Sequence, residues 1–271
     1  MKDVKGRWAV VTGGAAGMGR LWAEHLIRDG ANVALWDINA GLLEKTAQEL
    51  RVRGGGQTLS YAVDVSDREA IYKNAEKVQE DTGGVDILIN NAGIVYADSF
   101  LDTPDERLSR TIDVNLKALM WTMKAFLPRM VQRNEGHVVN VSSASGFVGV
   151  PRMPAYTASK WGVIGLSESL RLEMELIGKK GVKFTTFCPS YVDTGMFEGA
   201  RAPLLTPMLK PHEAVALAYE GFKKDQPFVL APAMVKITPA LKWILPTKVF
   251  DFISHQFGVT SSMSQWKGHG R

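Results

Sequence analysis

The chain has 271 residues, of which 45% are hydrophobic and 22% charged, a composition that is typical of a folded globular protein and excludes a disordered or fibrous chain. The formal net charge is only +4, and the lysines and arginines are spread along the sequence, so we expect no nucleic-acid partner. The single cysteine, Cys188, excludes an intrachain disulfide and is expected to be a small buried apolar residue.

The first residues run directly into a strand pattern without a recognisable leader, and no stretch reaches the ~18 apolar residues that a membrane-spanning helix needs. We therefore expect a cytoplasmic protein whose contact with a membrane, if any, is peripheral. The histidines show no paired ligand spacing, so we expect no metal site.

Short apolar runs alternate with longer segments of helical periodicity, a pattern that predicts β-α-β units and a parallel sheet covered on both faces. The runs expected to form strands are 7–12, 32–37, 58–63, 86–90, 137–142, 182–187 and 228–230. The predicted fold class is α/β: a single doubly wound domain over residues 1–231, with a seven-stranded, mostly parallel sheet and helices on both faces.

One helix start can be predicted in detail. Thr103 is expected to be the N-cap, with Pro104 in the first turn and Glu106 completing a capping box. The helix is expected to end near Arg133, which places Asn115 inside it.

A glycine-rich turn, TGGAAGMG (12–19), follows the first predicted strand and opens a helix. Gly13 would permit the tight turn, Gly17 would let the backbone approach a pyrophosphate, and Gly19 would allow close packing of helix and strand. The turn therefore indicates a dinucleotide site at the N-terminus of that helix.

Asp37 lies 18 residues after Gly19, at the end of the second strand, where its carboxylate can accept hydrogen bonds from an adenosine ribose. A 2′-phosphate would meet like-charge repulsion there, and neither Ala16 nor positions 38 and 39 supply a positive charge. The expected cofactor is NAD rather than NADP. The alternative is that Asp37 only caps the following helix.

Several motifs occur in a characteristic order: TGGAAGMG, Asp64-Val65, NNAG (90–93), Asn115, Ser143 and YTASK (156–160). Together they resemble the short-chain dehydrogenase/reductase family over about residues 6–231. Stretches such as LWDIN (35–39) and VPRMPAYTASK (150–160) are similar to a branch of retinol and 17β-hydroxysteroid dehydrogenases. The resemblance implies a Rossmann-type fold and an oxidoreductase.

The resemblance also implies the catalytic roles. Tyr156 would take the hydroxyl proton from an alcohol and return it in the reverse direction, and Lys160 would assist it and bind the nicotinamide ribose. Ser143 would donate a hydrogen bond to the substrate oxygen, with Ser142 as the competing candidate. Asn115 would hold a water that links Lys160 to solvent.

Tyr156 and Lys160 are four residues apart, so on a helix they share a face. Lowering the pKa of a tyrosine from ~10 to ~7 requires about 4 kcal/mol. An ammonium at ~4–5 Å in an effective dielectric of ~20 supplies about that much. The pair is therefore expected to replace a histidine as the general base, provided that the oxidised nicotinamide adds its own positive charge nearby.

The remaining cofactor contacts follow from the resemblance. Ser190 stands where the family usually has glycine, in the segment expected to contact the nicotinamide. The full set of expected cofactor residues is Gly13, Ala16, Gly17, Met18, Asp37, Ile38, Asp64, Val65, Asn91, Ala92, Gly93, Tyr156, Lys160, Pro189, Val192 and Thr194.

Substrate choice is expected to depend on the segments after the fifth and sixth strands. The segment 196–209 is predominantly apolar, which predicts a lipophilic secondary alcohol or ketone as the small-molecule substrate. The expected substrate residues are Ser143, Phe147, Met153, Tyr156, Met196 and Phe197. The alternatives are a carbonyl reductase that prefers NADPH and a non-catalytic protein that senses NAD(H).

Residues 232–271 are richer in apolar residues than a solvated end should be. One interpretation is an apolar helical extension that packs on the same domain or on a neighbouring subunit. The other is a segment that lies on a membrane surface, because Lys236, Lys242 and Lys248 flank Trp243. The family resemblance further implies a homodimer or homotetramer that pairs through the helices containing Asn115 and Tyr156.

Overall fold

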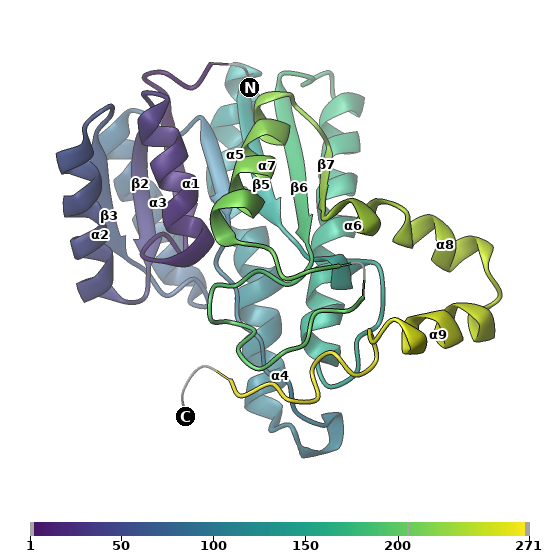
Figure 1. Ribbon diagram of the computed structural model, residues 1–271. Helices are drawn as coiled ribbons and strands as arrows, with labels where there is room; N and C mark the ends of the chain where they lie inside the picture. Colours follow the sequence, from purple (N-terminus) through teal and green to yellow (C-terminus); the bar gives the residue numbers. More distant parts are fainter. Residues whose placement is uncertain (1–2, 205, 269–271) are drawn as a thin grey trace.

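Seven parallel strands form one sheet in the order β3-β2-β1-β4-β5-β6-β7 (Figure 1). The computed structural model describes residues 3–204 and 206–268. Outside the described residues lie 1–2 of the segment 1–231, 269–271 of the segment 232–271, and Leu205 of the apolar segment 196–209. The strands are β1 (Trp8–Thr12), β2 (Asn32–Asp37), β3 (Thr58–Ala62), β4 (Ile87–Asn90), β5 (Gly136–Val141), β6 (Val182–Pro189) and β7 (Phe228–Ala231).

The sheet confirms the predicted doubly wound Rossmann-type fold, and each predicted strand lies within one or two residues of its observed position. The strands are continuous apolar runs because both faces of the sheet are covered. In β4, for example, all four residues of ILIN are buried. Sheet pairing between β1 and β4 marks the point where the strand order reverses, which is where doubly wound folds bind their ligands.

Helices cover both faces of the sheet (Figure 1). Trp22, Leu50 and Phe222 belong to a core on the face covered by α1, α2 and α7, whereas Ile71, Phe126 and Val163 belong to the core under α3, α5 and α6. The bounds are α1 (Gly17–Arg28), α2 (Ala40–Arg53), α3 (Arg68–Thr82), α4 (Asp105–Ile112), α5 (Ala118–Arg133), α6 (Pro154–Leu176) and α7 (Pro211–Lys223).

The predicted capping box before α4 is wrong. The Thr103 hydroxyl donates a hydrogen bond of 2.8 Å to the Ser99 carbonyl oxygen, because Thr103 closes the short turn η1 (Phe100–Asp102). Pro104 occupies the N-cap position, and no side chain caps the helix. The predicted end of the long helix near Arg133 is confirmed.

The long helix is interrupted in the middle. A π-helical turn, η2 (Asp113–Lys117), joins α4 to α5, and Asn115 lies at its centre. Such turns insert one residue into a helix and occur mostly where a side chain has a functional position. Asn115 therefore lies within helical backbone, as predicted, but not within a regular α-helix.

After β7 the chain forms η4 (Ala233–Lys236) and two short helices, α8 (Thr238–Ile244) and α9 (Thr247–Gln256). These helices project from the body at the end where the strands terminate (Figure 1). The segment after α9 returns across the loop that follows β6: the Leu204 and Arg201 N–H groups donate to the carbonyl oxygens of Phe257 and Ser262. Within the described part of the chain, no helix has the length and apolarity needed to cross a bilayer.

Candidate active site

The glycine-rich turn after β1 adopts a backbone that requires glycine. Gly13 and Gly17 have φ angles of +64° and +53°, in the left-handed region. A Cβ on Gly19 would lie 2.0 Å from the Gly13 carbonyl oxygen, so Gly19 packs against the turn itself. A Cβ on Gly17 would project toward Thr194 at 3.6 Å, and its absence leaves room over the N-terminus of α1.

Asp37 closes this turn from the end of β2. Its Oδ2 accepts a hydrogen bond from the Ala15 N–H at 3.1 Å, and its Oδ1 accepts one from the Asn39 N–H at 3.0 Å. The alternative that Asp37 only caps α2 does not hold, because the N-cap of α2 is Asn39, whose side chain accepts from the Leu42 N–H. Asp37 is therefore held at the rim of the turn.

A cavity of about 180 Å³ lies beside Asp37. Its lining includes seven of the predicted cofactor residues: Gly13, Asp37, Ile38, Asp64, Val65, Ala92 and Gly93. Arg110 of α4 also lines it and was not predicted; its guanidinium pairs with Asp64 at 2.9 Å and donates to the Ser66 hydroxyl. The sequence carries no local signal for this residue, because Arg110 is 46 positions from Asp64.

A second cavity, of about 40 Å³, contains most of the remaining predicted residues. Its lining includes Met18, Asn91, Gly93, Ser143, Tyr156, Lys160, Pro189, Val192, Thr194, Met196 and Phe197. Ala16 and Gly17 line neither cavity and are exposed at the N-terminus of α1. Ser190 also lines it, and the chain accommodates serine there because Ser190 is not among the described residues with positive φ.

The side chain of Asn91 offers an unused acceptor in this second cavity. Its Nδ2 donates to the Thr12 carbonyl oxygen at 3.1 Å, whereas its Oδ1 is buried without a hydrogen-bond partner. A buried polar atom without a partner costs about 1–3 kcal/mol. Together with the glycine turn and the Asp37 rim, this acceptor makes the two cavities fit a bound dinucleotide.

Tyr156 and Lys160 lie one turn apart on α6 and are both buried. The Lys160 Nζ is 5.5 Å from the centre of the Tyr156 ring, and it donates a hydrogen bond of 2.9 Å to the Val141 carbonyl oxygen. The helical spacing therefore brings the two side chains together, as expected.

The protein atoms alone do not lower the pKa of Tyr156 in the expected direction. Burial raises the pKa of Tyr156 well above its ordinary value, and a hydrogen bond with Ser143 only opposes that rise. Burial also lowers the pKa of Lys160 to about 8. Both shifts have the same cause, since removing a group from water disfavours its charged form.

Ser143 and Ser142 have different surroundings. The Ser142 hydroxyl is used inside the fold, where it donates to the Lys160 carbonyl oxygen at 2.8 Å. Both serines line the cavity that contains Tyr156, and the Ser143 Oγ accepts a hydrogen bond of 3.2 Å from the Ser145 N–H. The Ser143 hydroxyl also hydrogen-bonds with Tyr156, whereas the Ser142 proton is donated to the backbone, which supports the choice of Ser143 over Ser142.

The side chain of Asn115 bridges the end of β4 and α6. Its Oδ1 accepts from the Ile94 N–H at 2.8 Å, and its Nδ2 donates to the Ile94 carbonyl oxygen at 2.9 Å and to the Ser159 hydroxyl at 3.2 Å. Both amide hydrogens are therefore used within the protein. The resemblance implies that Asn115 holds a water, but its side chain has no free donor for that role.

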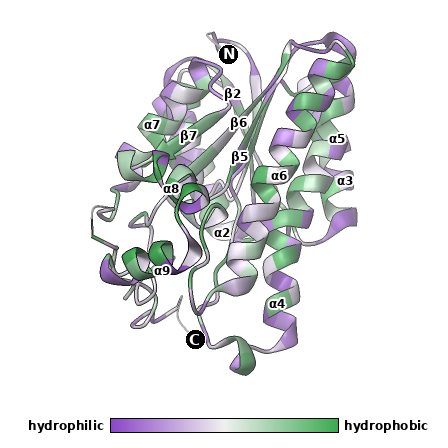
Figure 2. Cartoon of the chain, turned by 90° about the vertical axis from the view of Figure 1, so that its right-hand side faces the viewer, coloured by the Kyte–Doolittle hydropathy of each residue, from purple (hydrophilic) through white to green (hydrophobic). Residues whose placement is uncertain are grey.

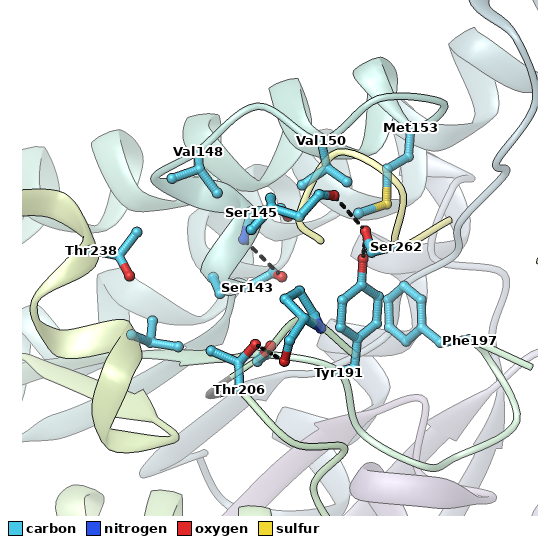
Figure 3. A pocket seen from close by; sticks show the side chains of 15 residues that line it. Ser143, Ser145, Val148, Val150, Met153, Tyr191, Phe197, Thr206, Thr238 and Ser262 are labelled. Carbon is cyan, nitrogen blue, oxygen red and sulfur yellow. Dashed lines mark hydrogen bonds between the residues drawn. The ribbon is translucent and has the colours of Figure 1, made fainter. Parts of the chain in front are cut away.

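A third cavity, of about 80 Å³, lies on the other side of Ser143 (Figure 3). Val148, Val150 and Met153 form one wall, and Phe197 and Tyr191 form the opposite wall. The Phe197 ring stands edge-on to the Tyr156 ring, with centroids 6.0 Å apart.

Three predicted substrate residues, Phe147, Tyr156 and Met196, do not line the third cavity. Phe147 lines none of these three cavities, because it ends the turn η3 (Ala144–Gly146) and its ring packs toward Phe228. Met196 lines the cavity that contains Tyr156 rather than the third cavity.

Sequence reasoning missed Tyr191, Ser145 and the tail residue Ser262. The Tyr191 hydroxyl donates to Ser262 Oγ at 2.8 Å across 71 positions, which closes the far wall of the third cavity (Figure 3). Ser145 also lines this cavity, and its hydroxyl is buried without a partner. Cys188 is fully buried, and burial raises its pKa to about 12, in keeping with the apolar role expected for it.

A model of the short chain dehydrogenase family matches residues 7–204. The chain belongs to the short-chain dehydrogenase/reductase family. As a short-chain dehydrogenase it is an oxidoreductase that uses a nicotinamide dinucleotide.

Two curated members of this family illustrate the similarity. Epidermal retinol dehydrogenase 2 of Mus musculus is 40% identical over 260 residues, covering 95% of this chain and 84% of that protein. Estradiol 17-beta-dehydrogenase 11 of Mus musculus is 36% identical over 258 residues, covering 95% of this chain and 86% of that protein. The predicted resemblance to the retinol and 17β-hydroxysteroid dehydrogenases is thus confirmed.

Solved structures of dehydrogenases share the fold. One from Burkholderia phymatum, in complex with NAD, has a TM-score of 0.82 at 24% identity and covers 96% of this chain and 98% of its own. An alcohol dehydrogenase from Thermococcus sibiricus, complexed with 5-hydroxy-NADP, has a TM-score of 0.72 at 29% identity and covers 80% and 90%. Both forms of the dinucleotide therefore occur among the similar structures.

Proposed function

We propose that the protein interconverts a lipophilic secondary alcohol and its ketone with NAD(H). The observation that carries this proposal is the position of Ser143, which lines both the cavity that contains Tyr156 and Lys160 and the cavity walled by Val148 and Val150. Ser190 and Phe197 are shared between the same two cavities. A substrate in the apolar cavity would thus have its oxygen beside Ser143.

The dinucleotide would extend along the two cavities on the other side of Ser143. Asp37 would accept hydrogen bonds from the adenosine ribose, and the adenine would lie near Asp64 and Val65. Lys160 and the segment 189–194 would hold the nicotinamide end. When bound, the cofactor supplies the hydride acceptor or donor and, in its oxidised form, a positive charge beside Tyr156.

The residues of the chain handle the proton. Because burial raises the pKa of Tyr156, the phenol is protonated at neutral pH and suits donation of a proton to a carbonyl oxygen. In the oxidative direction the phenolate must be stabilised, and the Lys160 ammonium is the cationic side chain against the ring. Ser143 would donate a hydrogen bond to the substrate oxygen where negative charge develops.

The substrate class follows from the lining of the cavity. Aliphatic and aromatic side chains dominate it, and the polar groups are hydroxyls such as Ser143, Ser145 and Thr238. Such a site favours an apolar molecule with one oxygen function. The names of the relatives, a retinol dehydrogenase and an estradiol dehydrogenase, support the same class.

The variant Tyr156→Phe tests this proposal. We expect NADH to bind as tightly as to the wild type, while kcat for a panel of steroids, retinoids and aliphatic alcohols falls by about 10²–10⁴-fold. Tyr61→Phe, which removes a phenol hydroxyl that donates to Asp81 and lines none of the three cavities, serves as the control. A variant that binds NADH and keeps wild-type turnover would refute the catalytic role, and a wild type that binds NADH but turns over nothing would favour the NAD(H)-sensing alternative.

The proposal includes assembly as a homodimer or homotetramer through α5 and α6. Met120 on α5 and Leu172 on α6 are exposed large hydrophobic residues, as expected of faces that pair. Light scattering of the wild type and of Met120→Glu/Leu172→Glu would test this: a wild-type monomer would contradict it. The proposed location is the cytoplasm, which fractionation of expressing cells would check.

A further inference from the structure

The two helices that follow β7 expose most of their apolar side chains. We call residues 237–256, which contain α8 and α9, the tail hairpin. Trp243 and Ile244 at the end of α8 are 76% and 78% exposed, and Phe252 on α9 is 64% exposed. Ile237, Leu241 and Val249 are exposed as well, and neither helix contains a buried residue.

Several contacts hold the tail hairpin in place. The Lys242 Nζ lies 4.1 Å from the centre of the Trp161 ring on α6 and donates a hydrogen bond of 3.0 Å to the Phe147 carbonyl oxygen. At the other end, the Leu204 N–H donates to the Phe257 carbonyl oxygen at 2.9 Å. The tail hairpin is thus held in a fixed position. Its two helices project from the body of the protein (Figure 1), and both carry hydrophobic residues (Figure 2).

An apolar groove connects the tail hairpin to the active site. It has a volume of about 200 Å³, and Leu241, Phe250 and Ile253 of the hairpin line it. Five of its residues also line the cavity next to Ser143: Val148, Pro203, Thr206, Thr238 and Val259. The groove and the cavity therefore adjoin, and an apolar path runs from the hairpin to Ser143.

We propose that the tail hairpin docks on an anionic lipid bilayer and that the groove receives the apolar substrate directly from the lipid. Trp243, Ile244 and Phe252 would enter the boundary between headgroups and acyl chains, where an aromatic ring with a polar edge is favoured. The delivery of substrate rests on the proposed function, whereas the docking does not.

The charges of the hairpin region favour a lipid over a second copy of the chain. Exposed Lys236 and Lys248 flank the apolar residues, and Asp251 is the acidic residue of the hairpin. Anionic headgroups complement this positive charge. A second copy placed on the same face by a two-fold axis would bring like charges together, which opposes pairing.

The variant Trp243→Ser/Phe252→Ser tests the docking, since neither residue lines the groove. The matched control is Val52→Ser/Leu101→Ser, which removes two apolar side chains that are still more exposed and belong to α2 and η1. The full chain is floated with vesicles of phosphatidylcholine, with and without phosphatidylserine. We expect wild type and control to float with the anionic vesicles, and the hairpin variant to bind at least tenfold more weakly.

The charge contribution is measured separately with Lys236→Gln/Lys248→Gln. Removal of each lysine should weaken binding to the anionic vesicles about fivefold, and this loss should become smaller as salt is added. A wild type that floats with neither kind of vesicle overturns the proposal. So does a hairpin variant that still floats but changes from dimer to monomer in light scattering.

Substrate delivery is measured as turnover of a long-chain alcohol dissolved in the vesicles against a short, water-soluble secondary alcohol. We expect the hairpin variant to lose about tenfold with the first and to stay within about twofold of wild type with the second. Equal losses with both alcohols contradict delivery from the lipid. Hairpin-dependent vesicle binding without turnover of any alcohol would refute the proposed function and still support the docking.

Discussion

The carboxamide of Asn115 makes two hydrogen bonds to the backbone of Ile94, accepting from its N–H at 2.8 Å and donating to its carbonyl oxygen at 2.9 Å. A third bond, to Ser159, reaches α6 one residue before Lys160. Asn115 thus fixes the chain after β4 relative to the helix that carries Tyr156 and Lys160. A residue in this place positions others rather than touching the substrate.

Replacing Asn115 with leucine should therefore damage both stability and turnover. Asn115→Leu leaves the Ile94 N–H and carbonyl groups without their partner, which we expect to cost about 2–4 kcal/mol in the free energy of unfolding. Urea unfolding measures this loss. Asn115→Asp keeps the acceptor for the Ile94 N–H and should lose less; equal stability of Asn115→Leu and wild type would contradict the bridging role.

The two neighbouring serines should separate into a structural and a catalytic residue. Ser143→Ala removes the donor to the substrate oxygen, so kcat should fall by about 10²–10³-fold, and the lost bond from the Ser145 N–H should cost about 1 kcal/mol of stability. Ser142→Ala removes the bond to the Lys160 carbonyl oxygen and should cost about 1 kcal/mol of stability with a smaller effect on kcat. Steady-state kinetics and thermal unfolding of both variants would decide; the reverse pattern would assign the role to Ser142.

Asp37 should set the preference for NAD over NADP. Asp37→Asn removes the charge but keeps one acceptor for the turn, so the ratio of kcat/KM for NADH over NADPH should fall by about 10–100-fold. Asp67→Asn, at the N-cap of α3, makes the same charge change at a residue that does not line the cavity and serves as the control. An unchanged ratio, or a wild type that prefers NADPH, would support the NADPH-preferring alternative.

The lowered pKa of Lys160 should appear in the stability of the protein as a function of pH. The pKa is about 8 in the folded chain and 10.5 ordinarily, so between these values the unfolded chain holds a proton that the folded chain has released. The contribution of Lys160 to the free energy of unfolding therefore rises with pH across this window, by about 3 kcal/mol in all. Below pH ~8 it is constant and destabilising.

Lys160→Met should consequently exceed the wild type in stability near pH 7, and the two should converge as the pH approaches 10.5. Urea unfolding at intervals from pH 7 to pH 10.5 provides the measurement. The variant should also lose turnover, so its gain in stability should be accompanied by a loss of activity. Parallel stability curves for the two proteins would show that the ammonium is not buried as described.

The sheet and most of the cofactor cavity could be predicted because their signals are local. NVALWD was expected at 32–37 and forms β2 over the same residues, since a buried parallel strand is a continuous apolar run. The glycine turn and YTASK are likewise short, contiguous patterns. Helical spacing alone placed Lys160 against the Tyr156 ring.

The features that were missed depend on residues far apart in the sequence or on burial. Tyr191 and Ser262 meet only because the tail folds back over the loop after β6, and Arg110 reaches Asp64 from another helix. Spacing gives the proximity of Tyr156 and Lys160 but not their burial, which raises the pKa of Tyr156 in the protein without its cofactor. The capping motif failed because Thr103 had a nearer acceptor at Ser99.

The π-helical turn at Asp113–Lys117 places an extra residue in the middle of a long helix. In a regular helix each residue advances the side chains by about 100° around the axis. Shortening this turn by one residue would therefore rotate α5 relative to α4, carrying Phe126 and Met130 away from the sheet that they now cover. The additional amino acid in this turn thus sets both the packing of α5 and the position of the Asn115 carboxamide, which connects Ile94 to α6.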